Sequence, residues 1–194
     1  MNFLRLRSIK TILSWQRLIV SCLLMLGCVF LIGMRPALAN LNDDHFDGNI
    51  FVLYTGNGSL VPPRVKLAES LKADKPTLLL FYVDDSRDCK QYAPVVSRLQ
   101  AFYGRAADFI AMNVDTMPPK STYTPTEAGY YYESVVPQIL VFNKSGDVVL
   151  NKKGQVPFEE VDDVFREVFN LLPRSESVEL KLRPVNEFNN ELAK

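Results

Sequence analysis

The sequence predicts an α/β domain in which a central mixed β-sheet is flanked by helices. Apolar runs of strand length, at residues 77–83, 109–114 and 138–142, alternate with segments whose apolar residues recur at helical spacing. A polar turn joins the first of these runs to the longest helical pattern. Because helices between strands cover the faces of a sheet, this order predicts a sheet layered between helices.

Residues 1–39 have the composition of an export signal. A basic stretch precedes an apolar run at residues 18–34, and the small residues Ala37 and Ala39 suit cleavage by signal peptidase. The apolar run is also close to the minimum length of a membrane-spanning helix, so an uncleaved N-terminal membrane anchor is the competing interpretation. In both cases the basic end stays in the cytoplasm, and the chain after residue 39 crosses the membrane.

The chain after the leader is expected to begin with a short linker, followed by the first strand of the domain. Residues 40–48 are polar and predict the linker, and the apolar run at residues 49–54 predicts the strand. Pro62 and Pro63 then favour the start of a helix, because proline is tolerated in the first helical turn. The residues expected on one face of that helix are Leu67, Ala68 and Leu71.

The centre of the predicted domain is a strand, a turn and a helix. The run at residues 77–83 is continuously apolar and rich in strand formers, which is typical of a buried strand. Beyond the polar turn, the apolar positions at helical spacing are Tyr92, Val96, Leu99 and Tyr103. The turn therefore lies between the end of a buried strand and the N-terminus of a helix.

The rest of the domain is predicted to complete the sheet. Residues 109–114 form the next strand, and the loop at residues 115–125 contains three prolines that exclude regular helix from its middle. A short helix at residues 126–132 precedes a hairpin whose strands are residues 138–142 and 148–150.

The last predicted helix begins at Pro157 and ends before Pro173. Its apolar stripe consists of Phe158, Val161, Phe165, Val168 and Leu172. The predicted domain therefore spans residues 49–172, and residues 173–194 form a polar C-terminal tail.

Charge and residue content exclude several classes of function. Five basic and no acidic residues precede Asn40, so the remaining 17 basic and 22 acidic residues give the body a net charge of −5. A body without a basic patch is not expected to bind nucleic acid. Its one thiol, Cys89, and its one histidine, His45, cannot form an internal disulfide or a metal site of several cysteines or histidines. We expect no metal and no cofactor.

Three separated segments together resemble the thioredoxin fold. Residues 89–94, Cys-Lys-Gln-Tyr-Ala-Pro, match the cysteine, the lysine and the helix proline of the redox motif. The segment at Val136 and Pro137 matches the one that carries the cis-proline facing the active site. Residues 143–147, with Gly154 beyond them, match the closing hairpin. The resemblance covers about residues 49–172 and implies a thioredoxin-like fold.

The motif departs from that of the redox-active members. Ser86 stands where the attacking cysteine is expected, and a serine hydroxyl does not replace a thiolate against a disulfide. Only Cys89 keeps a thiol. Thioredoxins use a buried acidic residue and a neighbouring lysine for proton transfer. The resemblance puts Leu80 and Ala111 at these two positions, so apolar residues replace both groups.

The turn also carries extra negative charge. Its acidic residues are Asp84, Asp85 and Asp88. Nearby carboxylates oppose the formation of a thiolate at Cys89. The sequence therefore predicts impaired redox chemistry, with Cys89 as the one candidate redox residue.

The membrane leader, the acidic body and the altered motif together resemble the cyanobacterial thylakoid membrane proteins linked to photosystem I accumulation. This resemblance implies a non-catalytic factor that promotes photosystem I accumulation or assembly by protein binding, with its domain on the lumenal or periplasmic side. The implied partners are photosystem I subunits or assembly proteins, and the membrane through the N-terminal segment. The alternative function is an exported thiol-disulfide oxidoreductase that acts through Cys89 alone.

The former substrate face is the predicted partner-binding surface. In thioredoxin-like folds, the backbone before the cis-proline can pair with an extended peptide. The tyrosines at positions 130–132 would add aromatic area nearby. The predicted partner-binding residues are Tyr82, Asp85, Ser86, Arg87, Cys89, Val136 and Pro137.

Overall fold

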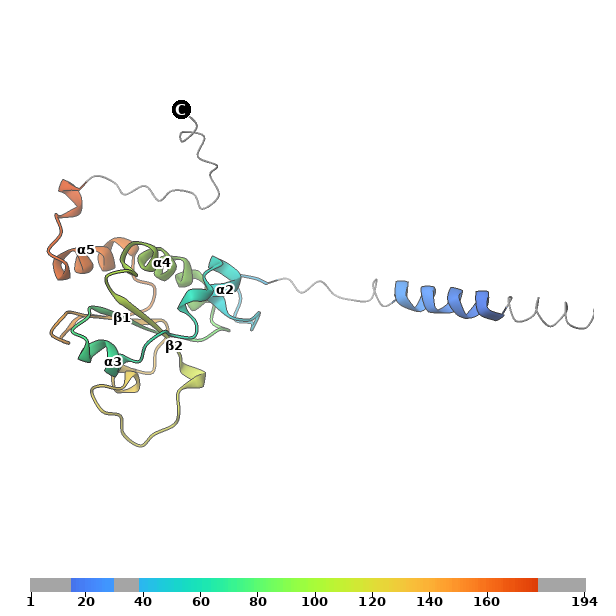
Figure 1. Cartoon of the computed structure of the whole chain (residues 1–194), viewed down its shortest axis with the longest axis horizontal. Coiled ribbons are helices and arrows are strands. Elements are labelled where there is room, and N and C mark those ends of the chain that lie inside the picture. The colour runs from blue at the N-terminus through green and yellow to red at the C-terminus, as the bar shows by residue number, and fades with distance from the viewer. Residues whose placement is uncertain (1–14, 30–38, 178–194) are drawn as a thin grey trace, which may run out of the picture. The chain divides into compact units, whose positions relative to one another are not determined.

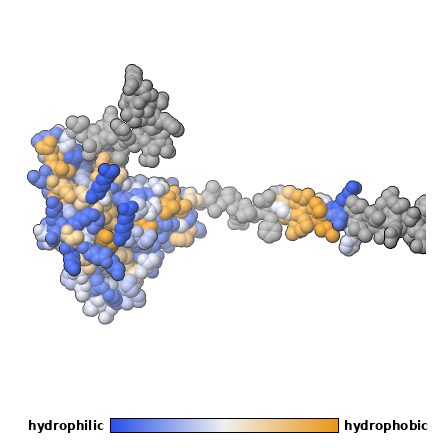
Figure 2. Space-filling model, viewed as in Figure 1, coloured by the Kyte–Doolittle hydropathy of each residue, from blue (hydrophilic) through white to orange (hydrophobic). Residues whose placement is uncertain are grey.

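The computed structural model describes residues 15–29 and 39–177, which belong to two separate compact units. In the first unit, residues 15–29 form a helix whose side chains are exposed, and Figure 2 shows the apolar surface that they present. Within the described ranges, no helix is long and apolar enough to cross a membrane. Most of the segment that we interpret as a signal peptide or anchor, residues 1–14 and 30–38, lies outside the described residues.

The second unit, the body, contains a four-stranded mixed sheet with the strand order β2-β1-β3-β4. Its strands are β1 (Thr77–Tyr82), β2 (Asp108–Asn113), β3 (Gln138–Phe142) and β4 (Val148–Lys153). β1 and β2 are parallel, whereas β3 is antiparallel to both β1 and β4. The predicted α/β class, with a central mixed sheet and thioredoxin-like architecture, is confirmed.

Helices cover both faces of this sheet (Figure 1). On one face lie α2 (Ile50–Thr55), α4 (Arg87–Tyr103) and α5 (Phe158–Val168). On the other lie α3 (Leu67–Lys72) and the 3-10 helix η3 (Ala128–Tyr131). Three further 3-10 helices are η1 (Gly58–Leu60), η2 (Val114–Thr116) and η4 (Arg174–Glu176).

The central strand β1 is buried on both faces, which explains its unbroken apolar sequence. Its side chains alternate between the two layers, as the pleat of a strand requires. Leu78 and Leu80 pack with the α4 side, and Leu79 and Phe81 pack with the α3 side. The four apolar positions predicted for the helix after the turn are all buried, so that helix face is confirmed.

The strand predicted at residues 49–54 is wrong, because this segment forms the helix α2. The Asn49 side chain accepts hydrogen bonds from the backbone N–H groups of the first turn and so caps the helix. From the end of β1, Asp84 Oδ1 accepts a further bond from Ile50 N at 3.0 Å. Gly56 then ends the helix with a left-handed φ of 63°. Periodicity in a six-residue apolar run does not distinguish a strand from a buried helix. Here the hydrogen bond to the distant Asp84 favours the helix, because it satisfies an N–H group of the first turn.

Residues 40–48, predicted as a linker, pack on the body. Lys90 Nζ lies 2.7 Å from Asp47 Oδ2 and 3.1 Å from Asp43 Oδ1, and it donates to the Asn40 carbonyl at 3.1 Å. The Lys90 side chain is 0% exposed. A buried ammonium group needs carboxylates and carbonyls as partners, and the segment supplies them. The compact body therefore begins at Ala39.

Two helix ends differ from the sequence expectation. α3 begins at Leu67 rather than at Pro62, and Ser70 is buried on its inner side where Ala68 is exposed. α5 ends at Val168, and Leu172 is 61% exposed instead of extending the apolar stripe. The chain turns back after α5 because Asn170 adopts a left-handed φ of 51°.

The start of the predicted C-terminal tail is docked on α5. Arg174 Nη2 donates to Asp163 Oδ1 at 2.8 Å and lies 3.3 Å from Asp162 Oδ2. Ser177 Oγ accepts a bond from Arg166 Nη1 at 2.7 Å. The remainder of the tail, residues 178–194, lies outside the described residues.

Candidate functional site

The candidate site lies where the end of β1 meets the start of β3. The antiparallel register pairs Phe81 with Gln138, so the turn that leaves β1 passes next to the chain that enters β3 through Val136 and Pro137. The Val136–Pro137 peptide bond is cis, as in the thioredoxin segment that this stretch resembles. The sheet therefore brings together the two segments that the sequence placed in one site.

The stretch after β4 connects these two segments. Gly154 N donates to the Pro137 carbonyl at 2.8 Å, and Gln155 Nε2 donates to Asp88 Oδ1 at 3.3 Å. Gly154 has a φ of 80°, a conformation that glycine adopts without the steric cost of a Cβ atom. One short stretch of chain thus holds both the first turn of α4 and the cis-proline segment.

Ser86, at the position of the attacking cysteine, caps the N-terminus of α4. Its backbone is extended, and its Oγ accepts a hydrogen bond from Cys89 N at 3.4 Å. Asp44 Oδ1 accepts another bond from Arg87 N at 2.8 Å. These oxygens satisfy N–H groups that have no partner inside the helix. Among the described residues, no hydrogen bond joins the Ser86 hydroxyl to a general base.

Ser86→Ala is expected to lower the free energy of unfolding by about 1 kcal/mol, because it removes the capping oxygen. Chemical denaturation followed by circular dichroism would measure the change. Ser86→Asp is the matched control, because a carboxylate caps as well as a hydroxyl does. Equal stability of Ser86→Ala and the wild type would show that this bond contributes nothing.

Cys89 is buried, with 1% of its surface exposed. Burial is the main cause that raises the pKa of the Cys89 thiol, and the charges of Asp88 and Asp84 raise it further, whereas hydrogen bonds at Val83 and Ser86 oppose the shift. The negative charge considered from the sequence thus acts in the expected direction but is secondary to burial. The thiol is inaccessible and protonated at neutral pH, which is the opposite of what disulfide exchange requires.

Three of the seven predicted partner-binding residues are buried. These are Tyr82, Cys89 and Pro137. The Tyr82 hydroxyl accepts a hydrogen bond from Asn49 Nδ2 at 3.2 Å, and burial raises the Tyr82 pKa to about 12. These three buried residues support the surface of the site and do not form part of it. The predicted residues that reach the surface are Asp85, Ser86, Arg87 and Val136.

Leu80 and Ala111 are direct neighbours across β1 and β2. Both are buried in the apolar core on the α4 side of the sheet. The resemblance assigns a proton-transferring acid and its lysine neighbour to these two positions. Because neither side chain titrates, proton transfer through this pair is excluded.

A charged cluster beside the turn was missed by the sequence analysis. This Lys90 cluster consists of Lys90, Asp43, Asp47 and Tyr54, whose hydroxyl donates to Asp47 Oδ2 at 2.6 Å. The hydrogen bond from Lys90 is the main cause that lowers the pKa of Asp47. Burial opposes the charge on Lys90, but its bonds to Asp47 and Asp43 outweigh that effect and raise its pKa. The acidic residues Asp43 and Asp47, just before the predicted domain, were the sequence feature that could have indicated this cluster.

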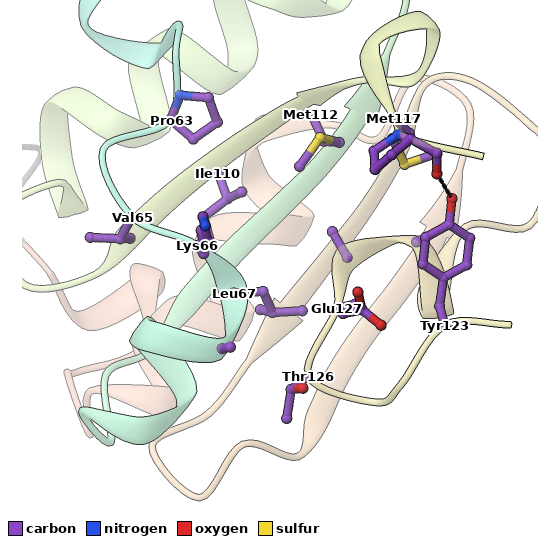
Figure 3. Close-up of a pocket in the computed structure, with 14 residues that line it drawn as sticks. Pro63, Val65, Lys66, Leu67, Ile110, Met112, Met117, Tyr123, Thr126 and Glu127 are labelled. Carbon is purple, nitrogen blue, oxygen red and sulfur yellow. Dashed lines mark hydrogen bonds between the residues drawn. The ribbon is translucent and has the colours of Figure 1, made fainter. Parts of the chain in front are cut away.

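A separate apolar pocket of about 430 Å³ opens on the α3 face of the sheet. Figure 3 shows its lining, with Leu67 of α3 on one side, Met117 and Tyr123 of the loop on the other, and Ile110 and Met112 of β2. Cys89 packs in the core on the opposite face, so this pocket is not part of the candidate site. Its walls come from distant segments, which is why no sequence pattern revealed it.

Comparisons with known proteins give two relatives, and no family model matches the chain. The thylakoid membrane protein slr1796 of Synechocystis is 55% identical over 156 residues, which cover 80% of this chain and 78% of that protein. The thiol:disulfide interchange protein TxlA homolog of the same organism is 26% identical over 98 residues, which cover 50% of this chain and 52% of that protein. The second similarity supports the thioredoxin-like superfamily.

Proposed function

The chain belongs to the family of the thylakoid membrane protein slr1796, and from that premise we propose that it is a non-catalytic, thioredoxin-like factor of the thylakoid membrane. It promotes the accumulation or assembly of photosystem I by binding photosystem I subunits or assembly proteins. The N-terminal segment directs it to the membrane, and the body lies on the lumenal or periplasmic side.

The observation that carries this proposal is the state of the motif turn. Ser86 is a helix cap, and Cys89 is buried with a raised pKa. The turn therefore provides a binding surface for a partner but no reactive nucleophile. Among residues 39–177, no hydrogen bond engages the backbone of Val136. That backbone suits strand-like pairing with an extended segment of a partner.

Deleting the gene tests the proposed role. We expect the ratio of photosystem I to photosystem II to fall, as measured by low-temperature fluorescence and by spectroscopy of the photosystem I reaction centre. Reintroduction of the wild-type gene should restore the ratio, and so should reintroduction of Cys89→Ser. An unchanged ratio under both low and high light would contradict the role.

The alternative function, an exported thiol-disulfide oxidoreductase acting through Cys89, is favoured by the similarity to the thiol:disulfide interchange protein. Insulin reduction and glutathione-dependent assays separate the two functions. Because the Cys89 pKa is raised, the thiolate fraction grows only toward alkaline pH, and we expect no activity near pH 7. Activity near pH 7 that disappears in Cys89→Ser would replace the binding function with the enzymatic one.

A further inference from the structure

The Lys90 cluster contains one cation and two carboxylates. Lys90 Nζ contacts both Asp47 and Asp43, and only 9% of the Asp47 side chain is exposed. The fourth member of the cluster, Tyr54, donates to Asp47. The exposed His45 also faces the cluster, with its Nδ1 3.5 Å from Asp47 Oδ1. Carboxylates withdrawn from water require cations or several hydrogen-bond donors. One ammonium group and two carboxylates give the Lys90 cluster a net charge of −1.

The backbone of Asn40 makes two hydrogen bonds with this cluster. Asn40 N donates to Asp47 Oδ2 at 3.2 Å, and the Asn40 carbonyl accepts from Lys90 Nζ at 3.1 Å. In the unprocessed chain this nitrogen belongs to a neutral amide. A free α-ammonium group at the same position would make a charge-assisted hydrogen bond, which is shorter and stronger than a neutral one. The cluster would then hold two cations and two carboxylates.

Two independent boundaries lie one residue apart at the start of the body. Ala37 and Ala39 are the small residues that signal peptidase requires, and the compact body begins at Ala39. We propose that the chain is processed between Ala39 and Asn40, and that the new α-ammonium group of Asn40 completes the Lys90 cluster. Residues 1–39 then act as a removable targeting signal.

The native N-terminus tests the first half of this proposal. The full chain, with a C-terminal affinity tag, is expressed in a cyanobacterium, purified and analysed by mass spectrometry, with Asn40 expected as the first residue. Ala39→Tyr should block processing. Leu38→Val should be processed normally, because the small-residue requirement falls on the positions to either side. A wild-type protein that retains Ala39 or any residue before it overturns the proposal.

The pKa of the α-amino group tests the second half. Reductive methylation of the processed protein with ¹³C-formaldehyde makes this group visible by NMR during a pH titration. We expect its pKa to lie at least about one unit above the ordinary 7.7–8.0, because Asp47 favours the charged form. An ordinary pKa in the wild-type protein overturns the proposed contact, whatever the variants show.

Two variants provide the comparison. Asp47→Asn should return the pKa of the α-amino group to its ordinary range. Asp44→Asn is the matched control and should leave that pKa raised, because Asp44 bonds to Arg87 N and not to Asn40. Neither readout depends on photosystem I. Failure of processing or of the contact is therefore distinguishable from failure of the proposed function.

Discussion

Replacing Lys90 by methionine is expected to lower the free energy of unfolding of the body by about 2–3 kcal/mol. Methionine preserves the apolar stem but leaves Asp43 and Asp47 without their shared cation. Removing one member of a buried ion pair is strongly destabilising, and the cost is moderated here because Asp43 is 43% exposed. Denaturation in urea measures the loss, and limited proteolysis should show release of residues 40–48.

A combined variant provides the control for this prediction. Lys90→Met together with Asp43→Asn and Asp47→Asn leaves no unpaired charge, so a substantial part of the stability should return. Equal stability of Lys90→Met and the wild type would mean that residues 40–48 contribute nothing to the folded body. A triple variant no more stable than Lys90→Met would show that packing, not charge, is what Lys90 provides.

Acid titration should reveal the same cluster. The Asp47 pKa is lower in the folded protein than in the unfolded chain, mainly because of the hydrogen bond from Lys90. Its stabilising contribution is therefore complete above the unfolded pKa of about 3.9 and declines as the pH falls toward the folded value. Wild-type stability should fall more steeply below about pH 4 than that of Lys90→Met. Parallel pH profiles of the two proteins would contradict this account.

Val136→Asp is expected to reduce partner capture at least about tenfold while the protein remains folded. Val136 is half-buried beside the cis-proline, where a partner strand would cover it. A carboxylate in a desolvated contact is strongly unfavourable unless it is paired. Co-purification from cells measures capture, and circular dichroism with thermal melting shows whether the fold persists.

Three variants complete this test. Val136→Thr keeps the shape of the side chain and should retain most of the capture. Val149→Asp introduces the same charge at a valine of β4 that is 42% exposed and lies outside the site, and it should leave capture unchanged. Cys89→Ser should be nearly neutral. Normal capture by folded Val136→Asp would remove this face from consideration, and loss with Cys89→Ser alone would favour a mixed disulfide.

The sequence by itself determined the features that depend on neighbouring residues. The unbroken run of β1 predicted a strand buried on both faces, and helical spacing predicted the inner face of α4. Ser86 and Cys89 showed that the redox motif had lost its nucleophile. These predictions were possible because side-chain periodicity is set by the local backbone, which repeats every two residues in a strand and every 3.6 in a helix.

Only the tertiary structure decided which distant groups meet. The segment at α2 became a helix because its cap Asn49 and its first N–H meet Asp84, 35 residues away from Asn49. Residues 40–48 became part of the body because Lys90 lies 43 residues beyond Asp47 in the chain and yet 2.7 Å from it in space. The same packing buried Cys89 and thereby raised its pKa. Burial and long-range pairing depend on how the layers assemble, and no spacing along the chain encodes that contact geometry.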